Sequence, residues 1–219
     1  FAINNGTRGS ELGSATTDAG GNFTMTMGAY SGPVMLQVHG GSYLDEATGM
    51  RMNMLDADEL TCVVPELTVT AGLTTAGIQV TPLTAMAQAW AAHMTGGMTA
   101  ANAILANSHI GAAYVGPGAD IVMMHPIDPT VAGSANGASI EAKNYGMILA
   151  AMSQSAHDLG MTTSSSAMVT AMSNDASDGI MNGRMNGTAS SGLRPSSSEM
   201  ASAELPRIRP SRAAPIVPE

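Results

Sequence analysis

The stretch from Gly13 to Gly49 most constrains what this chain can fold into, because strong turn formers alternate there with strand-like runs. The first turn is the run Asp18–Asn22. Its aspartate can accept hydrogen bonds from the amides ahead of it, and its two glycines can adopt positive φ. The residues that follow, Phe23–Met27, alternate apolar side chains with threonines, which is the period of a half-buried strand.

A second turn, Gly28–Pro33, precedes another alternating run. Val34, Leu36 and Val38 point to one side of an extended chain, and the residues between them point to the other. The two alternating runs therefore predict a β-hairpin with a connection of about five or six residues.

The run Thr17–Phe23 reads TDAGGNF and matches the pattern T-D-x-x-G-x-F/Y. It thereby resembles the carboxypeptidase-regulatory-like and Cna-B-like β-sandwich domains, small transthyretin-like modules of secreted and surface proteins. The wider pattern, GAYSGPVMLQVHGGSYLDEATG ahead of a helical segment near Val80, is similar to a group of bacterial surface proteins. The resemblance implies a bacterial protein that is secreted or held at the cell surface.

Members of that family begin with a strand of the form G-x-V-x…G-A-x-V upstream of this point. The present chain begins at Phe1 with what would be the second strand, so the resemblance implies a sandwich whose first strand is missing. Downstream, Met50–Met54 and Leu60–Val69 also alternate, the second run being interrupted by Pro65. The spacing predicts about five or six strands over residues 1–72, an antiparallel sandwich of transthyretin or immunoglobulin type.

From Thr81 the apolar period changes to that of helices. Thr81 can cap a helix that starts at Pro82, and Gly96 and Gly97 can end it. The residues that we expect on its buried face are Leu83, Met86, Ala87, Trp90 and Met94. A further helix is predicted from Thr99 to about residue 109. Its expected apolar stripe is Ala101, Ile104 and Leu105.

The longest helix is predicted from about Ala138 to Leu159, with Gly160 as its stop. Its apolar residues recur at three- and four-residue steps: Ala142, Tyr145, Leu149, Met152, Ala156 and Leu159. A shorter helix is predicted around residues 167–173. Residues 116–137 contain three prolines and form a long connection.

The pattern therefore predicts an α+β fold in three parts. The β-sandwich takes residues 1–72, and a helical bundle takes residues 80–180. Residues 181–219 lose all periodicity and are rich in Ser, Gly, Arg and Pro, so they predict a flexible or extended tail.

Charge divides the chain unevenly. The formal net charge is −9, but residues 1–183 hold three basic and fourteen acidic side chains, whereas residues 184–219 hold five basic and three acidic ones. A body this acidic disfavours nucleic-acid binding, which needs a basic footprint on the phosphates. A membrane-spanning helix requires a run of about 18 apolar residues, and no apolar run in this sequence is that long.

Cys62 is the only cysteine, so we expect no intrachain disulfide and read Cys62 as a small buried hydrophobe. The run His39–Ser42 reads HGGS and invites comparison with the oxyanion-hole motif of lipase-like hydrolases. The sequence has no G-x-S-x-G elbow to accompany it, which favours a glycine-rich turn. The five histidines show neither HxH nor HExxH spacing.

Two weaker patterns remain as candidate metal sites. Met50, Met52 and Met54 align on one strand face, and thioethers are soft ligands that suit Cu(I). Asp175 and Asp178 precede Gly179 in a way that faintly resembles a calcium loop. Core packing for the methionines and a plain helix-ending turn for the aspartates are the favoured interpretations, and we expect no cofactor.

These observations predict a non-catalytic extracellular or cell-surface module that acts through protein–protein contacts. A sandwich without one strand exposes unpaired backbone groups to which a neighbour's strand can add, so self-association into a fibre or surface layer is the expected form. The tail is one candidate donor of that strand. The alternative is a secreted ligand-binding module, for Cu(I) through methionines or for a carbohydrate as the accessory of an enzyme.

Overall fold

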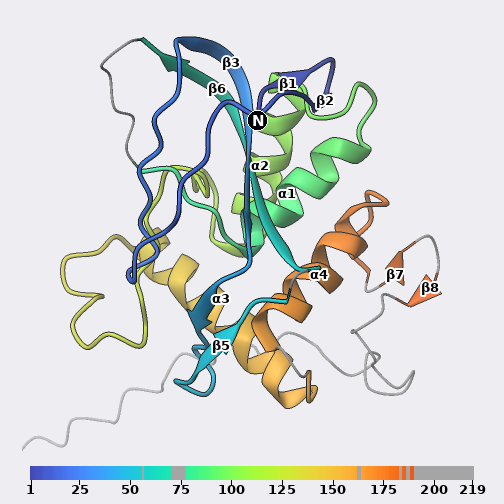
Figure 1. Cartoon of the computed structure of the whole chain (residues 1–219). Coiled ribbons are helices and arrows are strands. Elements are labelled where there is room, and N and C mark those ends of the chain that lie inside the picture. Colours follow the sequence, from blue (N-terminus) through green and yellow to red (C-terminus); the bar gives the residue numbers. More distant parts are fainter. Residues whose placement is uncertain (56, 71–76, 162–163, 183, 186–187, 190–219) are drawn as a thin grey trace, which may run out of the picture.

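The computed structural model describes residues 1–55, 57–70, 77–161, 164–182, 184–185 and 188–189. It is a mixed α/β structure with four helices and small antiparallel sheets, as predicted for the fold class (Figure 1). The strands are β1 (Ile3–Asn4), β2 (Thr7–Arg8), β3 (Tyr30–His39), β4 (Ser42–Leu44), β5 (Arg51–Asn53), β6 (Glu59–Val69), β7 (Arg184–Met185) and β8 (Thr188–Ala189). The helices are α1 (Pro82–His93), α2 (Ala100–Tyr114), α3 (Ile140–Asp158) and α4 (Ser164–Ala176).

Strands β3 and β6 form the long antiparallel ribbon at the centre of the fold. Their register changes by one residue between Gly32 and Val34, opposite Pro65, where a proline has no N–H to give to a ladder. Pro65 therefore marks a bulge within β6 and does not end the strand. The strands of the described residues form four two-stranded sheets, and a closed sandwich stays a prediction.

The predicted hairpin between Phe23–Met27 and β3 is wrong, because β3 pairs with β6. The turn before it is confirmed: Asp18 Oδ1 accepts hydrogen bonds from the amides of Gly20 at 2.8 Å and Asn22 at 2.9 Å. The alternation of Phe23–Met27 also appears in the burial, with the apolar side chains half-buried and the threonines exposed. The run belongs to no ladder of the described residues.

Helix α1 begins as its sequence predicts. Thr81 is the N-cap, Pro82 is the first helical residue, and the Thr81 amide donates to the Thr84 hydroxyl oxygen at 2.8 Å. Leu83, Met86 and Ala87 lie buried on the expected face. The Thr84 hydroxyl also donates to the carbonyl of Thr61 at 2.9 Å, which ties the start of the helix to β6.

The predicted apolar stripe of α2 is wrong. Ile104 and Leu105 are 57% and 61% exposed, and the face that packs inward consists of Ala103, Ala106, Ile110 and Gly111. Small residues occupy the inner face because the backbone of α2 approaches its neighbours closely. A Cβ on Gly111 would lie 2.5 Å from the Ala119 carbonyl oxygen.

Helix α3 ends at the predicted stop, where Gly160 has φ +66°. The expected stripe is buried at Ala142, Tyr145 and Ala156, but Leu159 is 47% exposed. Helix α4 is longer than predicted. Strands β7 and β8, which the sequence places in the tail, pair with each other after the end of α4. The remainder of the predicted tail, residues 190–219, lies outside the described residues.

A glycine contact joins the N-terminal turn to the connection between α1 and α2. The amide of Met98 donates to the Gly6 carbonyl at 2.7 Å. A Cβ on Gly6 would lie 1.7 Å from the Gly96 carbonyl oxygen, and one on Gly97 would lie 2.3 Å from that of Gly6. Only glycine fits at either position.

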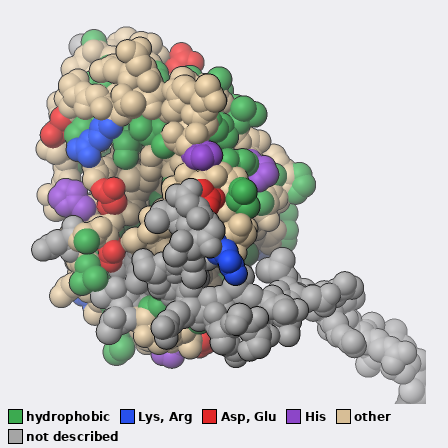
Figure 2. Space-filling view, turned by 90° about the vertical axis from the view of Figure 1, so that its right-hand side faces the viewer, with side chains coloured by type: hydrophobic (Ala, Val, Ile, Leu, Met, Phe, Trp, Pro, Cys, Tyr) green, Lys and Arg blue, Asp and Glu red, His purple; other side chains and the backbone are tan. Residues whose placement is uncertain are grey.

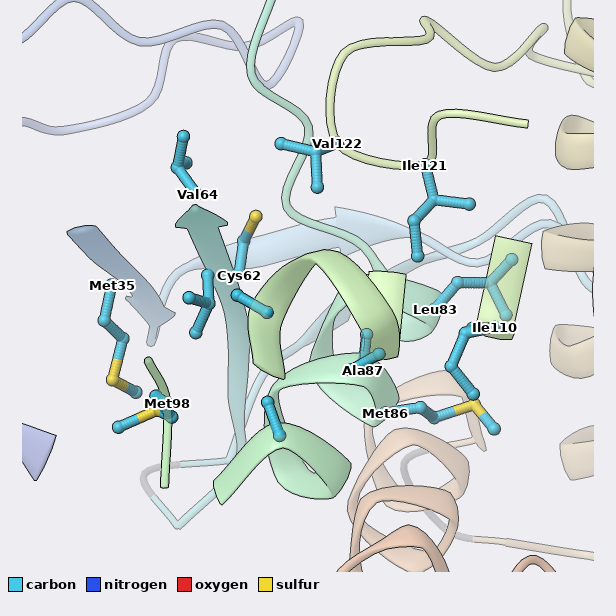
Figure 3. Packing of buried hydrophobic residues seen from close by; sticks show 14 of the residues in the cluster. Met35, Cys62, Val64, Leu83, Met86, Ala87, Met98, Ile110, Ile121 and Val122 are labelled. Atoms are coloured by element: carbon cyan, nitrogen blue, oxygen red, sulfur yellow. The ribbon is translucent and has the colours of Figure 1, made fainter. Parts of the chain in front are cut away.

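One hydrophobic core joins the ribbon to the helices, across the boundary that the sequence places near residue 72. In Figure 3, Met86 of α1 lies beside Ile110 of α2, and Cys62 and Val64 of β6 belong to the same buried cluster. Cys62 is fully buried, which confirms the expectation of a small core residue. Burial raises the pKa of its thiol to about 12.

On the face that carries α4 and β7, acidic, basic and histidine side chains are scattered among the described residues, without a large patch of one charge (Figure 2). Within the described residues, no helix combines the length and apolarity needed to cross a membrane.

Candidate functional site

The described structure has a half-open cleft of about 360 Å³. Its walls come from the end of β3, strand β4, the turn near Thr17, the segment that enters α1, and the middle of α3. Apolar side chains dominate the lining, with Phe23 and Tyr43 as its aromatic residues. Glu46 and Glu59 are the charged residues that line it, and no described lysine or arginine does.

A second hollow of about 210 Å³ adjoins the cleft. Leu44, Glu46 and Leu149 line both, so they form the wall between them. The outer side of the second hollow is the loop His125–Thr130. Gly146 brings that loop close to α3, because a Cβ there would lie 2.2 Å from the Ile127 carbonyl oxygen.

Asp45 holds the β4–β5 turn in place at the edge of the cleft. This residue is fully buried, and Ser153 of α3 donates to its Oδ1 at 2.9 Å. The Thr48 hydroxyl donates to its Oδ2 at 2.7 Å, and the Ala47 amide donates to Ser153 Oγ at 3.0 Å. The β4–β5 turn is thereby fixed to α3 through a residue more than a hundred positions away. Asp45 is therefore a buried structural residue and not a solvated turn charge.

Glu46, next in sequence, faces both hollows. Burial raises the pKa of its carboxyl, and the nearby charges of Asp45 and Asp128 raise it further. A hydrogen bond from its own backbone acts in the opposite direction. The attraction of a nearby cation would offset both the desolvation cost and the repulsion, so the site favours a positively charged partner.

The free edge of β3 runs into this cleft. Met35 and Phe1 exchange backbone hydrogen bonds of 2.9 Å on the side of β3 that faces away from β6. Gln37 and His39 lie two and four residues further on, so their backbone groups point the same way. Among the described residues, no backbone hydrogen bond reaches these outward groups. Val38, between them, lines the cleft.

The opposite edge of the ribbon is covered. The Thr61 carbonyl accepts from Thr84 of α1, and the Val63 carbonyl accepts from the Asn107 side chain of α2 at 3.0 Å. Side chains of the helices thus satisfy β6, whereas the outward backbone groups at the end of β3 have no partner among the described residues. Such an edge is the usual acceptor for strand addition.

The candidate metal residues lie in two places. Met50 is 59% exposed and Met52 is half-buried on β5, whereas Met54 lines the cleft. Asp175 is buried and its Oδ1 accepts from the amides of Asn182 and Arg184, at 3.1 and 2.8 Å. The described residues contain no group of three or more His, Cys, Asp or Glu side chains placed to hold a metal ion.

Asp178 also bonds to its own turn, since its Oδ1 accepts from the Ile180 amide at 3.0 Å. The run His39–Ser42 is a turn in which Gly40 and Gly41 have φ of +67° and +74°. This agrees with the glycine-rich turn that the sequence favours there.

Sequence reasoning missed Glu46 and Ser153 as site residues. The pattern Asp45-x-x-Thr48, with Gly49 behind it, is an aspartate turn that could have shown Asp45 to be structural. Ser153 carries no comparable signal, because its role depends on a contact made between distant segments.

Comparison of the chain with protein-family models, with curated proteins and with solved structures found no match in any of the three.

Proposed function

We propose that this protein is a non-catalytic module of the bacterial cell surface or extracellular space that works through protein–protein contacts, and that copies of it associate by strand addition. The observation that carries the proposal is the unpaired edge of β3 at Gln37 and His39. A strand added there would extend the β3–β6 ribbon, which is the step toward the sandwich that the sequence predicts.

The asymmetry of the ribbon supports strand addition at this place and not elsewhere. The outer carbonyls of Thr61 and Val63 on β6 already have partners from α1 and α2. Opposite Pro33, the register shift interrupts the ladder. The edge from Gln37 to His39 therefore offers regular backbone groups next to a hollow that can take the side chains of an incoming strand.

The test compares two substitutions of the exposed residue His39. His39→Pro removes the outward N–H, whereas His39→Ala keeps it and removes only the side chain. Neither touches a hydrogen bond to β6, since the backbone of His39 faces away from that strand. Static light scattering at tens of micromolar should show association of the wild type and of His39→Ala, and a lower mass for His39→Pro.

A wild-type protein that stays strictly monomeric at this concentration would contradict the proposal. Equal association of the His39→Pro and His39→Ala variants would place the contact on another surface and would also contradict it.

A second candidate function is the binding of a small ligand in the cleft. Its volume of about 360 Å³ lies within the range of small-molecule sites, and Phe23 and Tyr43 could stack on a sugar ring. Titration of oligosaccharides against the wild type and Tyr43→Ala tests the carbohydrate version. Metal analysis of the purified protein tests the copper version, which requires bound copper.

A further inference from the structure

The cleft and the tail of this chain carry opposite charge. Residues 1–183 hold three basic and fourteen acidic side chains, and the charged lining of the cleft consists of Glu46 and Glu59. The segment Leu205–Ala213, LPRIRPSRA, contains three arginines and no acid. A guanidinium is the cation best suited to a half-buried carboxylate, because it can donate two parallel hydrogen bonds.

The prolines of this segment fit an edge strand in one register. Backbone groups of an extended chain alternate between its two edges, so Pro206 and Pro210, four residues apart, fall on the same edge. The other edge keeps the N–H groups of Arg207 and Arg209. These are spaced by two residues, as are the unpaired groups of Gln37 and His39.

We propose that the segment Leu205–Arg212 of a second copy adds to the edge of β3 in parallel orientation, so that the backbone groups of Arg207 and Arg209 bond to those of Gln37 and His39. In this orientation the arginine side chains lie on the face of Val38, where a guanidinium group can bind Glu46. This inference rests on the proposed function and names the strand that is donated. Leu205, on the same side as the arginines, would meet the apolar part of the cleft lining.

Chain length favours a second copy over the same chain as donor. The described chain ends at Ala189 in β8, and Figure 1 shows this hairpin on the opposite side of the molecule from the blue N-terminal turn near Thr17, which lines the cleft. The fifteen residues before Leu205 have a root-mean-square reach of about 20 Å as a flexible chain. A globule of this size is about 40 Å across, so the tail of a neighbour is the less restricted donor.

The first experiment measures binding of a fluorescently labelled LPRIRPSRA peptide by anisotropy. The receptor is the full chain carrying Arg207→Gln and Arg209→Gln, so that its own tail does not compete. Saturable binding is expected, and adding Glu46→Gln should weaken it about tenfold, as for the loss of one charge-assisted hydrogen bond. Glu66→Gln is the matched control, because Glu66 is exposed on β6 and outside the cleft. Equal affinities of the two receptors would overturn the inference.

The second experiment measures mass by light scattering for three full chains. The wild type should associate, and both His39→Pro and Arg207→Gln/Arg209→Gln should not. If His39→Pro no longer associates but the arginine variant associates fully, then another strand occupies the edge. That result would refute this inference and leave the proposed function supported. A monomeric wild type whose arginine variant still binds the peptide would make the chain's own tail the occupant, and would overturn donation by a second copy.

Discussion

Tyr145 offers the sharpest test of how the core is held together. Its side chain is fully buried on α3, and its hydroxyl donates to the Ile121 carbonyl at 2.9 Å. The single phenolic proton is then used, so the 2.6 Å contact with Thr81 Oγ1 must have the threonine as donor. One oxygen thus joins α3, the N-cap of α1 and the loop before α3.

Tyr145→Phe removes that oxygen and leaves two buried groups without partners, the Ile121 carbonyl and the Thr81 hydroxyl. Each lost hydrogen bond contributes about 1 kcal/mol, and an unsatisfied buried group costs about 1–3 kcal/mol. We expect the free energy of unfolding to fall by about 2–4 kcal/mol. For a chain of this length, that corresponds to a Tm lower by about 5–10 °C.

The assay is urea unfolding followed by far-UV circular dichroism, with Tyr114→Phe as the control for the same chemical change. The Tyr114 hydroxyl is half-buried, and its hydrogen-bond partner among the described residues is a thioether, Met181 Sδ, at 3.8 Å. Its loss should therefore change stability by less than about 0.5 kcal/mol. A Tyr145→Phe variant as stable as Tyr114→Phe, with an unchanged m value, would refute the reasoning.

Three further predictions follow from other parts of the structure. The pKa of Cys62 is raised from 9.0 to about 12, so the thiol ionises more easily in the unfolded chain as the pH rises. The free energy of unfolding of the wild type should therefore fall by about 2 kcal/mol between pH 8 and 10.5, relative to that of Cys62→Ala. Equal shifts of the urea midpoint in the two proteins would contradict this. Because the pKa of Glu46 is raised in the folded state, its contribution to stability is present below pH 4.5 and is lost as the pH rises through the folded-state pKa. Glu46→Gln should therefore have a higher urea midpoint than the wild type at pH 7 and the same midpoint at pH 3.5. Gly111→Ala should lower the free energy of unfolding by about 2 kcal/mol, because the new Cβ would meet the Ala119 carbonyl at 2.5 Å. The reverse change at the exposed neighbour, Ala112→Gly, should cost only about 1 kcal/mol, and a stabilised Gly111→Ala in thermal melts would exclude the predicted clash.

The helix ends could be predicted from the sequence because their causes are local. Thr81 and Pro82 define the start of α1, and Gly160 stops α3, each through backbone groups within one turn. The turn at Asp18 was predictable for the same reason.

The pairing of β3 with β6 could not be predicted in this way. The two strands are separated by the β4–β5 excursion, and their choice of each other depends on α1 and α2 covering β6. Local alternation instead suggested the nearer run Phe23–Met27. A period shows which side of a strand is buried, but it does not identify the partner.

The prediction of the buried face of α2 is wrong for a related reason. Hydrophobicity favours Ile104 and Leu105 as the inner residues, yet close approach of the backbone requires Ala103, Ala106 and Gly111 there. The cleft could not be predicted for the same reason, because Asp45 and Ser153 come into contact only once α3 packs against the β4–β5 turn.

The contact between Gly6 and Gly97 also limits how this chain can vary over evolution. Most core contacts tolerate exchange, because a larger residue on one side can be balanced by a smaller one on the other. Here each missing Cβ faces a carbonyl oxygen of the opposite backbone, so no side chain is left to shrink. The two positions should therefore be fixed independently in any set of natural variants, without the paired changes by which contacts are commonly recognised in alignments.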